Sequence, residues 1–415
     1  MAFSSILTDE SGVSLDAESG DFLLTEGVYV LVTGAVTAPD RYGIDLCVDW
    51  IRKGECVGGQ LTGVKRHLEV GQWQLDAAVS SAELQTGVNL EDVNTVRLVR
   101  NNDTVVLSGR VGPIGGQGGG LQIVSAAGGD RFTLSGPDEF DLLASRLAWP
   151  DPATVPPWAT SHDTRSGMAS TVAAAYVTAN LGSGAITARQ IPGVTVVDGM
   201  AGLSGVWTAR LQPLDKLISR ICRDGGITCR ITVSTAGAIT VTFTSGRDRS
   251  ETVILSDQGD LVNNNRRAVP AAATFVIAGG TGTLTSRLFA TSGTATGLAR
   301  REVFNDQSSL VNATEVQQAA KTTAGLGAAA WSVESEIAVT VAQRLRYLDE
   351  YDVGDLIAVE IDDIRYTVPV EAVRFDIGAT RQTVTPVLGV AAPNLLSGLL
   401  RDIADLQSKP TNQIA

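Results

Sequence analysis

The stretch LIAVEIDDIRYTVPVEAV, residues 356–373, alternates apolar and polar side chains on both sides of an Asp-Asp pair. Successive side chains of a β-strand point to opposite faces, so apolar residues two apart line one face. That spacing recurs on each side of the pair, at Ile357, Val359, Ile361, Ile364, Tyr366, Val368 and Val370. Acidic residues in the two-residue gap are typical of a tight turn. The stretch therefore predicts a β-hairpin within a β-rich fold.

Five carboxylates crowd the same region, in YDVGDLIAVEIDD, residues 351–363: Asp352, Asp355, Glu360, Asp362 and Asp363. The last two belong to the predicted turn, and the first two flank Gly354 at the bend that enters the first strand. Glu360 falls on the face opposite the isoleucines. We interpret all five as solvated turn and edge charges. A metal site is the alternative, but Asp-x-x-Asp without a histidine or a calcium-loop pattern is a weak signal for it.

The two-residue period also runs through residues 29–134. It is clear in GIDLCVDWI, residues 43–51, and in GQWQLDAAV, residues 71–79. In VRLVRNNDTVVLSGRVG, residues 96–112, the triplet Asn101-Asn102-Asp103 separates two apolar runs, which predicts a second hairpin. Closure of the sheet would remove the exposed edges of so many short strands. We therefore expect a small, closed or nearly closed β-barrel here.

The middle of the chain has a helical period instead. In PLDKLISRICRDGG, residues 213–226, a proline opens the helix and two glycines cap it. Its apolar stripe has the spacing of a helix face, with Leu214, Leu217, Ile218 and Ile221. A second helix is expected over residues 170–181, and strands over residues 227–233 and 239–245. This segment is predicted to be an α+β domain.

A short helix is expected within PDEFDLLASRLAWPDP, residues 137–152, at the boundary between the first barrel and the middle domain. Its apolar side would be formed by Leu142, Leu143, Leu147 and Trp149. Pro150 would end the helix, and the prolines that follow it mark the boundary.

The predicted fold is mainly β, with two β-barrels flanking an α+β middle domain. The expected segments are an extended N-terminal arm (1–26), a first barrel (27–138), the α+β domain (139–250), a second barrel with a helical insert near residues 314–330 (251–390), and a C-terminal helix with a polar tail (391–415). A surface-packed tail is an equally good interpretation of residues 1–26. The C-terminal helix would present an apolar stripe of Leu396, Leu399, Ile403 and Leu406. It would dock on its own chain or on a neighbouring subunit.

Composition limits the possible functions. The 415 residues carry a net charge of −13, which disfavours phosphate-gripping proteins. Cys47, Cys56, Cys222 and Cys229 form no Cys-x-x-Cys pair and are expected to be reduced and buried. The first residues contain acids where an export signal needs basic residues, and residues 268–286 are too rich in Gly, Pro and Thr for a membrane helix. A soluble protein without membrane insertion is expected.

The sequence nominates no catalytic, cofactor-binding or metal-binding residue. GPIGGQGGG, residues 112–120, lacks the Gly-Lys-Ser/Thr ending of a phosphate loop and predicts a flexible hairpin loop. His67 and His162 are the possible imidazole bases, and each is expected to be a surface or loop residue. We therefore expect no enzyme and no cofactor.

Several stretches resemble the tail-hub (minor tail) proteins of long-tailed bacteriophages, especially those of actinobacterial phages. LSGPDEFDLLASRLAWPDP, residues 134–152, resembles the transition out of the family's first barrel, and PLDKLISRICRDGG resembles its middle-domain helix. YDVGDLIAVEID (351–362), YTVPVEAVRFDI (366–377) and TPVLG (385–389) are similar to the family's closing strands, with Tyr351, Gly354 and Asp355 as matching positions. These proteins are related in architecture to the baseplate hubs of contractile tails and to type VI spikes.

The resemblance implies a structural protein at the distal end of the virion tail, made in the host cytoplasm. Three copies with two hub-type barrels each would form a pseudo-sixfold ring that adapts the sixfold tail tube to threefold symmetry. The implied partners are its own copies, distal tail and tube proteins, the tape-measure protein, and receptor-binding or spike and fibre proteins, with viral DNA only passing through. No lysozyme-like or peptidase-like domain is recognisable. The alternative is a β protein that binds or depolymerises cell-surface glycans, although such enzymes usually have an aromatic-lined groove with two carboxylates.

Overall fold

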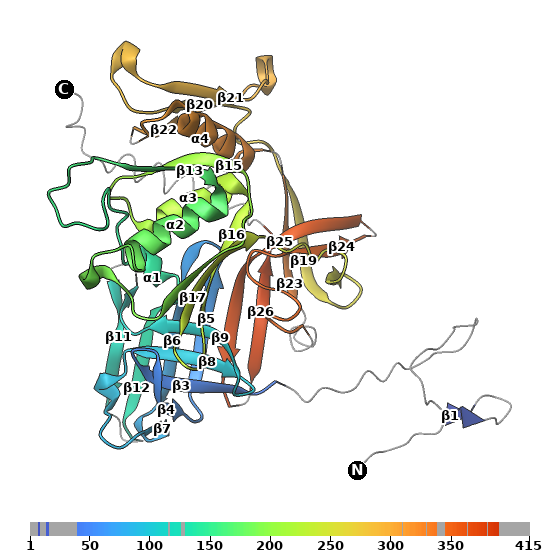
Figure 1. Cartoon of the computed structure of the whole chain (residues 1–415). Helices are drawn as coiled ribbons and strands as arrows, with labels where there is room; N and C mark the ends of the chain where they lie inside the picture. The colour runs from blue at the N-terminus through green and yellow to red at the C-terminus, as the bar shows by residue number, and fades with distance from the viewer. Residues whose placement is uncertain are drawn as a thin grey trace. The chain divides into compact units, whose positions relative to one another are not determined.

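The computed structural model describes residues 7–8, 14–15, 40–114, 117–125, 129–308, 310–328, 330–337, 345–362, 364–379 and 381–389 (Figure 1). The chain divides into two compact units, Met1–Pro39 and Asp40–Ala415. In the first unit, β1 (Leu7–Thr8) and β2 (Ser14–Leu15) form an antiparallel pair. The rest of the predicted N-terminal arm and the whole predicted C-terminal helix lie outside the described residues.

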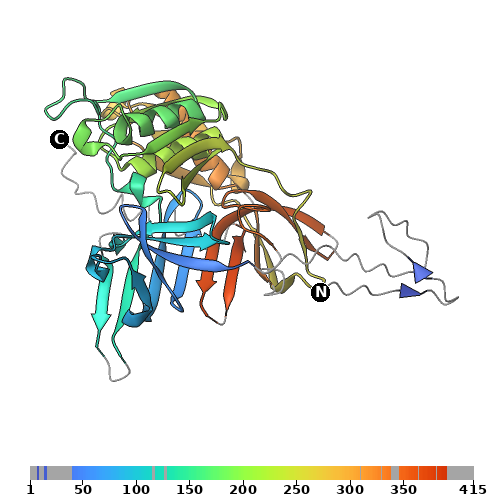
Figure 2. The same ribbon diagram turned by 60° about the horizontal axis from the view of Figure 1, so that its bottom comes forward.

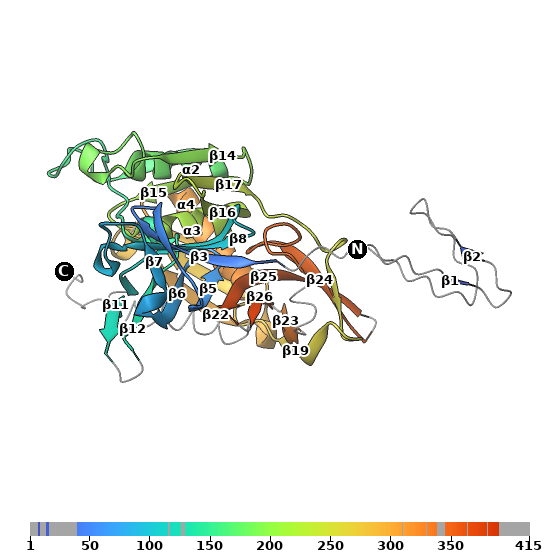
Figure 3. The same cartoon turned by 90° about the horizontal axis from the view of Figure 1, so that it is seen from below.

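The predicted C-terminal hairpin belongs to a nine-stranded sheet with strands from both β-rich parts of the sequence. Its order is β10-β11-β12-β6-β5-β25-β24-β18, and β26 also pairs with β25. The junction is the antiparallel pair of β5 and β25, in which Gly63 lies opposite Phe375 (Figure 3). The strands are β5 (Gln60–Arg66), β6 (Glu69–Ala78), β10 (Pro113–Ile114), β11 (Gln117–Val124), β12 (Arg131–Pro137), β18 (Ile254–Ser256), β24 (Leu356–Ile361), β25 (Ile364–Ile377) and β26 (Gln382–Leu388). The sequence patterns did not predict this shared sheet.

The hairpin itself is confirmed. Strands β24 and β25 pair in antiparallel register from Leu356–Pro369 to Ile361–Ile364. Asp362 has φ 51°, the left-handed conformation that short polar turn residues tolerate. The apolar side chains expected on the inner faces are buried, except that Ile364 is half exposed and Tyr366 is partly buried. The hairpin therefore contributes to a core that also contains side chains of β5, β6, β8 and β12.

The N-terminal part of the second unit forms a five-stranded sheet in the order β7-β4-β3-β8-β9. The predicted hairpin of residues 96–112 joins its last two strands, and Asn101 and Asn102 have φ values of 52° and 65°. An isolated bridge between Gly109 and Asp138 connects this sheet with the end of β12. Figure 2 shows its blue and cyan strands next to the red C-terminal ones. The strands are β3 (Tyr42–Val48), β4 (Ile51–Cys56), β7 (Ala82–Leu84), β8 (Thr95–Arg100) and β9 (Thr104–Arg110).

The middle segment combines helices and short sheets, as predicted. Its strands are β13 (Asp163–Met168) paired with β15 (Ser204–Ala209), and β14 (Val194–Asp198), β17 (Ile239–Ser245) and β16 (Ile227–Val233) in a second sheet. Helix α2 (Ala169–Leu181) and helix α3 (Leu214–Gly225) pack on each other and on these sheets (Figure 1). Helix α3 is capped by Gly226, whose backbone has the left-handed conformation. Each side chain of its predicted apolar stripe is at most 1% exposed. The mainly-β fold with an α+β middle is thus confirmed.

The helix predicted at the boundary is much shorter than expected. Helix α1 (Asp141–Ala144) comprises only four residues. Leu142 and Leu143 are buried as expected, but Leu147 is 45% exposed and lies beyond the helix, so its predicted place on the apolar side is wrong. A backbone hydrogen bond from Leu214 to Arg146 and a bridge between Leu147 and Pro213 hold this part of the chain extended beside the start of α3.

The helical insert is confirmed as part of a small module between two paired strands. Strands β19 (Leu261–Val269) and β23 (Ala330–Ile337) are antiparallel neighbours. Between them lie β20 (Phe275–Gly279), β21 (Phe289–Ser292), β22 (Glu302–Asp306) and helix α4 (Ala313–Leu326). Asn312 caps α4, since its side chain accepts a hydrogen bond from the backbone N–H of Thr314 at 2.7 Å. The module has its own small apolar core.

Short 3₁₀ turns complete the second unit, at Val79–Ser81, Leu90–Asp92, Thr187–Arg189, Leu284–Ser286 and Gly297–Ala299. The loop of residues 112–120 is a hairpin as predicted, with Pro113 opposite Gly119. All four cysteines are free and buried, as expected. No helix among the described residues is long and apolar enough to cross a membrane.

Candidate functional site: buried charges at the segment junctions

The two carboxylates that enter β24 are buried, so the prediction of solvated turn charges is wrong for them. Asp352 and Asp355 are each 2% exposed. Arg247 donates from Nε to both oxygens of Asp355 at 3.1 Å and from Nη2 at 2.6 Å. Nη2 of Arg230 lies 2.5 Å from Oδ2 of Asp352. Both arginines come from the middle segment, so the pairs fasten the C-terminal strands to it. The exposed Asp362 keeps its predicted turn position, whereas Asp363 lies outside the described residues.

The backbone around Gly354 positions these carboxylates. Asp355 accepts a hydrogen bond from the N–H of Asp352 at 2.8 Å, which closes the predicted bend. Gly354 has φ 87°, and a Cβ atom there would lie 2.7 Å from the ring of His67. A glycine is therefore required for two reasons, the left-handed backbone and the close approach of the imidazole.

A second buried group of charges adjoins the first. Lys65 on β5 pairs with Glu139, whose Oε2 also accepts hydrogen bonds from the N–H and the hydroxyl of Ser108 at 3.2 and 3.0 Å. Burial alone would lower the pKa of Lys65, but the charges of Glu139 and Asp352 raise it. For Asp138, burial and the neighbouring Glu139 raise the pKa well above its usual range. We call Lys65, His67, Asp138, Glu139, Arg230, Arg247, Asp352 and Asp355 the junction cluster.

Part of the junction cluster lines a cavity of about 20 Å³, which has room for roughly one water molecule. The members that line it are Lys65, His67, Asp138, Glu139, Arg230 and Asp352. Oδ2 of Asp138 is buried at this place without a hydrogen-bond partner. Within the described ranges, no three His, Cys, Asp or Glu side chains are arranged to hold a metal ion. Asp352, Asp355 and Glu139 are each paired with a guanidinium or ammonium group, which is the arrangement of a structural network.

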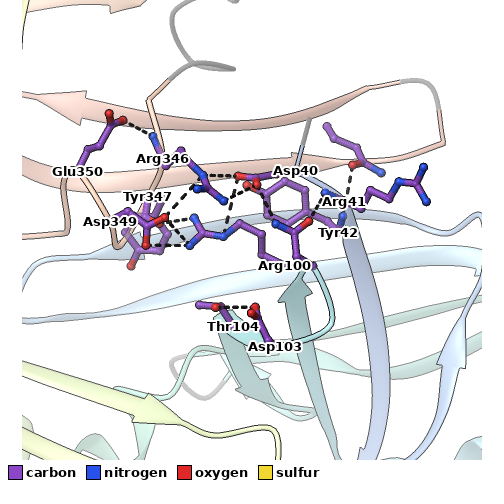
Figure 4. Close-up of polar contacts among 12 residues, drawn as sticks. Asp40, Arg41, Tyr42, Arg100, Asp103, Thr104, Arg346, Tyr347, Asp349 and Glu350 are labelled. Carbon is purple, nitrogen blue, oxygen red and sulfur yellow. Dashed lines mark hydrogen bonds and ion pairs between the residues drawn. The ribbon is translucent and has the colours of Figure 1, made fainter. Parts of the chain in front are cut away.

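A separate polar group joins the end of β8 to residues 345–350 (Figure 4). Arg100 is 3% exposed and donates to the backbone oxygen of Tyr347 at 2.7 Å and to both oxygens of Asp349 at 3.0 Å. Asp40 accepts from Arg346 at 2.8 Å and lies 3.9 Å from Arg100. Burial would raise the pKa of Asp40, but these arginines and Asn101 lower it. The N-terminal and C-terminal strands of the second unit are thereby joined at this end as well.

Arg97 connects the five-stranded sheet with the turn between β16 and β17. Its side chain is 0% exposed, and it donates from Nη1 to the backbone oxygens of Ser234 and Thr235 at 2.8 Å each. Its Nη2 donates to Asp45 at 2.9 Å. Sequence analysis missed this residue and the other buried arginines. The available signal was an arginine within the otherwise apolar strand TVRLVR, residues 95–100.

Other predicted residues lie elsewhere. His67 occupies the turn between β5 and β6, which fits the expected loop position, but it is half-buried within the junction cluster. His162 precedes β13 and its Nδ1 is 2.7 Å from the hydroxyl of Ser161. The predicted subunit contacts Leu396, Leu399, Ile403 and Leu406 lie outside the described residues.

A family model described as siphovirus ReqiPepy6 Gp37-like protein matches residues 49–390. The chain belongs to this family. The match includes the junction cluster and every strand of the nine-stranded sheet. It confirms the predicted membership in a siphophage tail protein family, while an actinobacterial origin stays a prediction. A comparison with curated proteins finds no match.

The Gp37-like chain also has the fold of a solved phage tail protein. It is 12% identical to the 43 kDa tail protein of prophage MuSo2 from Shewanella oneidensis, with a TM-score of 0.52 over 86% of this chain and 99% of that one. A tail protein from Neisseria meningitidis MC58 is also 12% identical, with a TM-score of 0.48 over 85% and 97% of the two chains. Prophage tail protein gp18 from Listeria monocytogenes EGD-e is 10% identical, with a TM-score of 0.46 over 88% and 99%. Family and fold together make the chain a virion tail component.

The junction cluster of the Gp37-like chain should respond to acid through His67. Burial and the positive charge of Arg223 together lower the pKa of His67 to about 4, although the charges of Asp352 and Asp355 oppose the shift. Because the unfolded imidazole titrates near 6.5, the stability from the neutral ring is present above about pH 6.5. It is lost as pH falls through about 4, by an amount on the order of 2–3 kcal/mol. Urea unfolding midpoints between pH 7 and pH 4 measure this loss.

The variant His67→Gln cannot gain the ring proton, and its urea midpoint should fall less over the same range. The difference between the urea midpoints of the two proteins reports the effect of His67 alone. Asp138 is present in both proteins, and its raised pKa acts in the opposite sense, because its contribution to stability increases as pH falls. Equal acid sensitivity of the wild type and His67→Gln would contradict the assignment.

Proposed function

We propose that the chain is a structural hub at the distal end of the phage tail, where three copies form a ring that closes the tail tube. The pairing of β5 with β25 carries this proposal, because it places two β-rich segments side by side in each protomer. Three such protomers would present six β-rich segments, which suits contact with a sixfold tube above and threefold components below. Each interface in such a ring is heterologous but closed.

The proposed hub is divided as the sequence suggests, with β-rich segments 27–138 and 251–390 around the α+β segment 139–250. Residues 1–26 and 391–415 are proposed to act at its periphery, and Leu396, Leu399, Ile403 and Leu406 to contact a neighbouring subunit. The buried ion pairs at Asp352 and Asp355 support a rigid protomer, since they fasten the C-terminal strands to the middle segment.

The proposed partners are the distal tail and tube proteins, the tape-measure protein, and receptor-binding or spike components, with viral DNA passing through the ring. Synthesis in the host cytoplasm precedes assembly. The role is architectural and not enzymatic. In support, three buried carboxylates, Asp352, Asp355 and Glu139, are held by arginine or lysine side chains. A carboxylate so paired is poorly suited to acid–base catalysis.

The test is the mass of the purified chain in solution, measured by light scattering from 1 to 100 μM and then with the tail-tube protein added. One protomer has a mass of 43.3 kDa, so a trimer has 3 × 43.3 = 129.9 kDa. We expect this mass in at least the second condition. A monomer or a dimer throughout would overturn the ring. Incubation with host cell-wall glycans should release no reducing ends, and release would favour the depolymerase alternative.

A further inference from the structure

The junction cluster contains one more buried acid than it has cations to pair with. Its four acids are each at most 3% exposed: Asp138, Glu139, Asp352 and Asp355. Three of them have a cation of their own, in the ion pairs Lys65–Glu139, Arg230–Asp352 and Arg247–Asp355. Among the described residues Asp138 forms no ion pair, and it is the most deeply buried of the four, at 1% exposure. With every acid ionised, the cluster would carry one unbalanced negative charge.

The two oxygens of Asp138 have different surroundings. Oδ1 accepts a hydrogen bond from the backbone N–H of Phe140 at 3.1 Å. Oδ2 is buried close to the backbone of Gly71 on β6, since a Cβ atom at that glycine would lie 2.4 Å from it. Among the described residues, Oδ2 accepts no hydrogen bond of good geometry. One oxygen of this carboxyl group is therefore available to carry a proton.

The other groups around the cavity supply no further positive charge. The ionisable side chains that line it with Asp138 are Lys65, His67, Glu139, Cys229, Arg230 and Asp352. His67 and Cys229 are uncharged at pH 7, because burial lowers the pKa of the imidazole to about 4 and raises that of the thiol. The two cations already contact Glu139 and Asp352. Their pairing leaves the charge of Asp138 unmatched.

The energetic balance at Asp138 favours its neutral form. The charge of Lys65 and the backbone N–H groups of Gly71 and Phe140 favour the carboxylate, but burial and the charge of Glu139 outweigh them and raise the pKa of Asp138 well above its usual range. An unpaired carboxylate in a protein interior has lost its hydration without compensation, and taking up a proton removes that cost. The cavity beside it has room for one water, which can accept a hydrogen bond from the acid.

We propose that Asp138 is protonated in the folded protein at neutral pH, and that its proton keeps the junction between β12 and the C-terminal strands closed. Oδ2 donates to a water in the cavity, and the water donates to Oδ2 of Asp352, which also accepts no hydrogen bond of good geometry among the described residues. Loss of the proton in alkaline solution leaves a buried negative charge beside Glu139 and Asp352, so the junction loosens. The inference concerns a single chain and is independent of the proposed ring.

Infrared spectroscopy detects the proton directly. The protein is labelled with ¹³C at the side-chain carboxyl groups of aspartate, and we expect the band of a protonated aspartate at pH 7. The band should be lost in Asp138→Asn and kept in Asp141→Asn. Asp141 is the matched control because burial raises its pKa too, although Arg110 lies 3.7 Å away. No such band in the wild type, or its loss in Asp141→Asn, would overturn the inference, whether or not Asp138→Asn folds.

The pH dependence of stability gives an independent measurement. A folded pKa above the unfolded value near 3.9 contributes stability that is present below that value and is lost as pH rises. Asparagine keeps the shape of the neutral acid and has no proton to lose. The unfolding equilibrium constant of the wild type, divided by that of Asp138→Asn, should therefore rise about tenfold per pH unit between pH 5 and pH 7. A ratio that does not change with pH would mean that Asp138 is ionised in the folded protein.

Hydrogen exchange shows whether the proton holds the junction closed. At pH 9, the backbone amides of residues 352–354 and 67–71 should exchange faster in the wild type than in Asp138→Asn, and at pH 5 the two proteins should exchange alike. Comparison at the same pH removes the intrinsic dependence of exchange on hydroxide. Amides of helix α4, in the inserted module, serve as the internal control and should not differ between the two proteins. Equal exchange of the junction amides at both pH values would contradict the proposed closing role.

Discussion

Replacement of Asp355 by asparagine is expected to lower the free energy of unfolding by about 3 kcal/mol. The change keeps the size of the side chain and removes its charge, so Arg247 loses a partner that it contacts through two nitrogens. Asp355 is 2% exposed, and the cost arises because a positive charge remains beside a buried, uncharged group. Urea unfolding followed by tryptophan fluorescence measures the loss.

Two further variants show whether the charge pair is responsible. Glu360→Gln removes a partly exposed carboxylate in the same hairpin and should change the free energy of unfolding by less than about 0.5 kcal/mol. The double variant Asp355→Asn with Arg247→Met removes both charges and should be more stable than Asp355→Asn alone. A double variant that is less stable than the single one would show that the stranded arginine is not the cause.

Arg97→Met is expected to be destabilising by about 3–5 kcal/mol. Methionine fills part of the same space, but it donates no hydrogen bonds, so the carbonyl oxygens of Ser234 and Thr235 lose their partner. The β16–β17 turn should therefore open more often than in the wild type. Hydrogen exchange should quicken at residues 233–239 before it changes in α3, and urea unfolding gives the overall loss.

Arg52→Met is the matched control, because Arg52 pairs with the same carboxylate. Asp45 accepts a hydrogen bond from Nε of Arg52 at 2.8 Å, but the Arg52 side chain is 51% exposed. An ion pair so accessible to water contributes at most about 1 kcal/mol. If Arg52→Met and Arg97→Met lowered the free energy of unfolding equally, the burial of Arg97 and its two backbone contacts would add nothing to stability.

Local elements were largely predictable from the sequence. The turn at Asp362 and the stripe of α3 depend on residues that are close in the chain, and both appear as predicted. The shared sheet was not predictable in the same way. Strands β5 and β25 are separated by about 300 residues, and the two-residue period that marks each strand carries no information about its neighbour.

The site was harder to predict than the fold. Asp352 and Asp355 flank a glycine, a local pattern typical of a solvated bend, and the bend is indeed present. Their burial depends on Arg230 and Arg247, which are more than 100 residues earlier in the chain. Charged side chains enter an interior only when such partners meet them, so a single segment cannot reveal which acids are buried.

The strands β19 and β23 leave Val269 opposite Ala330, so the chain departs into the inserted module and returns at adjacent points. A module attached in this manner behaves as a cassette. Genetic exchange between phages could remove it or substitute another of different length while both flanking strands keep their register. For the same reason, a designer could graft a foreign domain at this position.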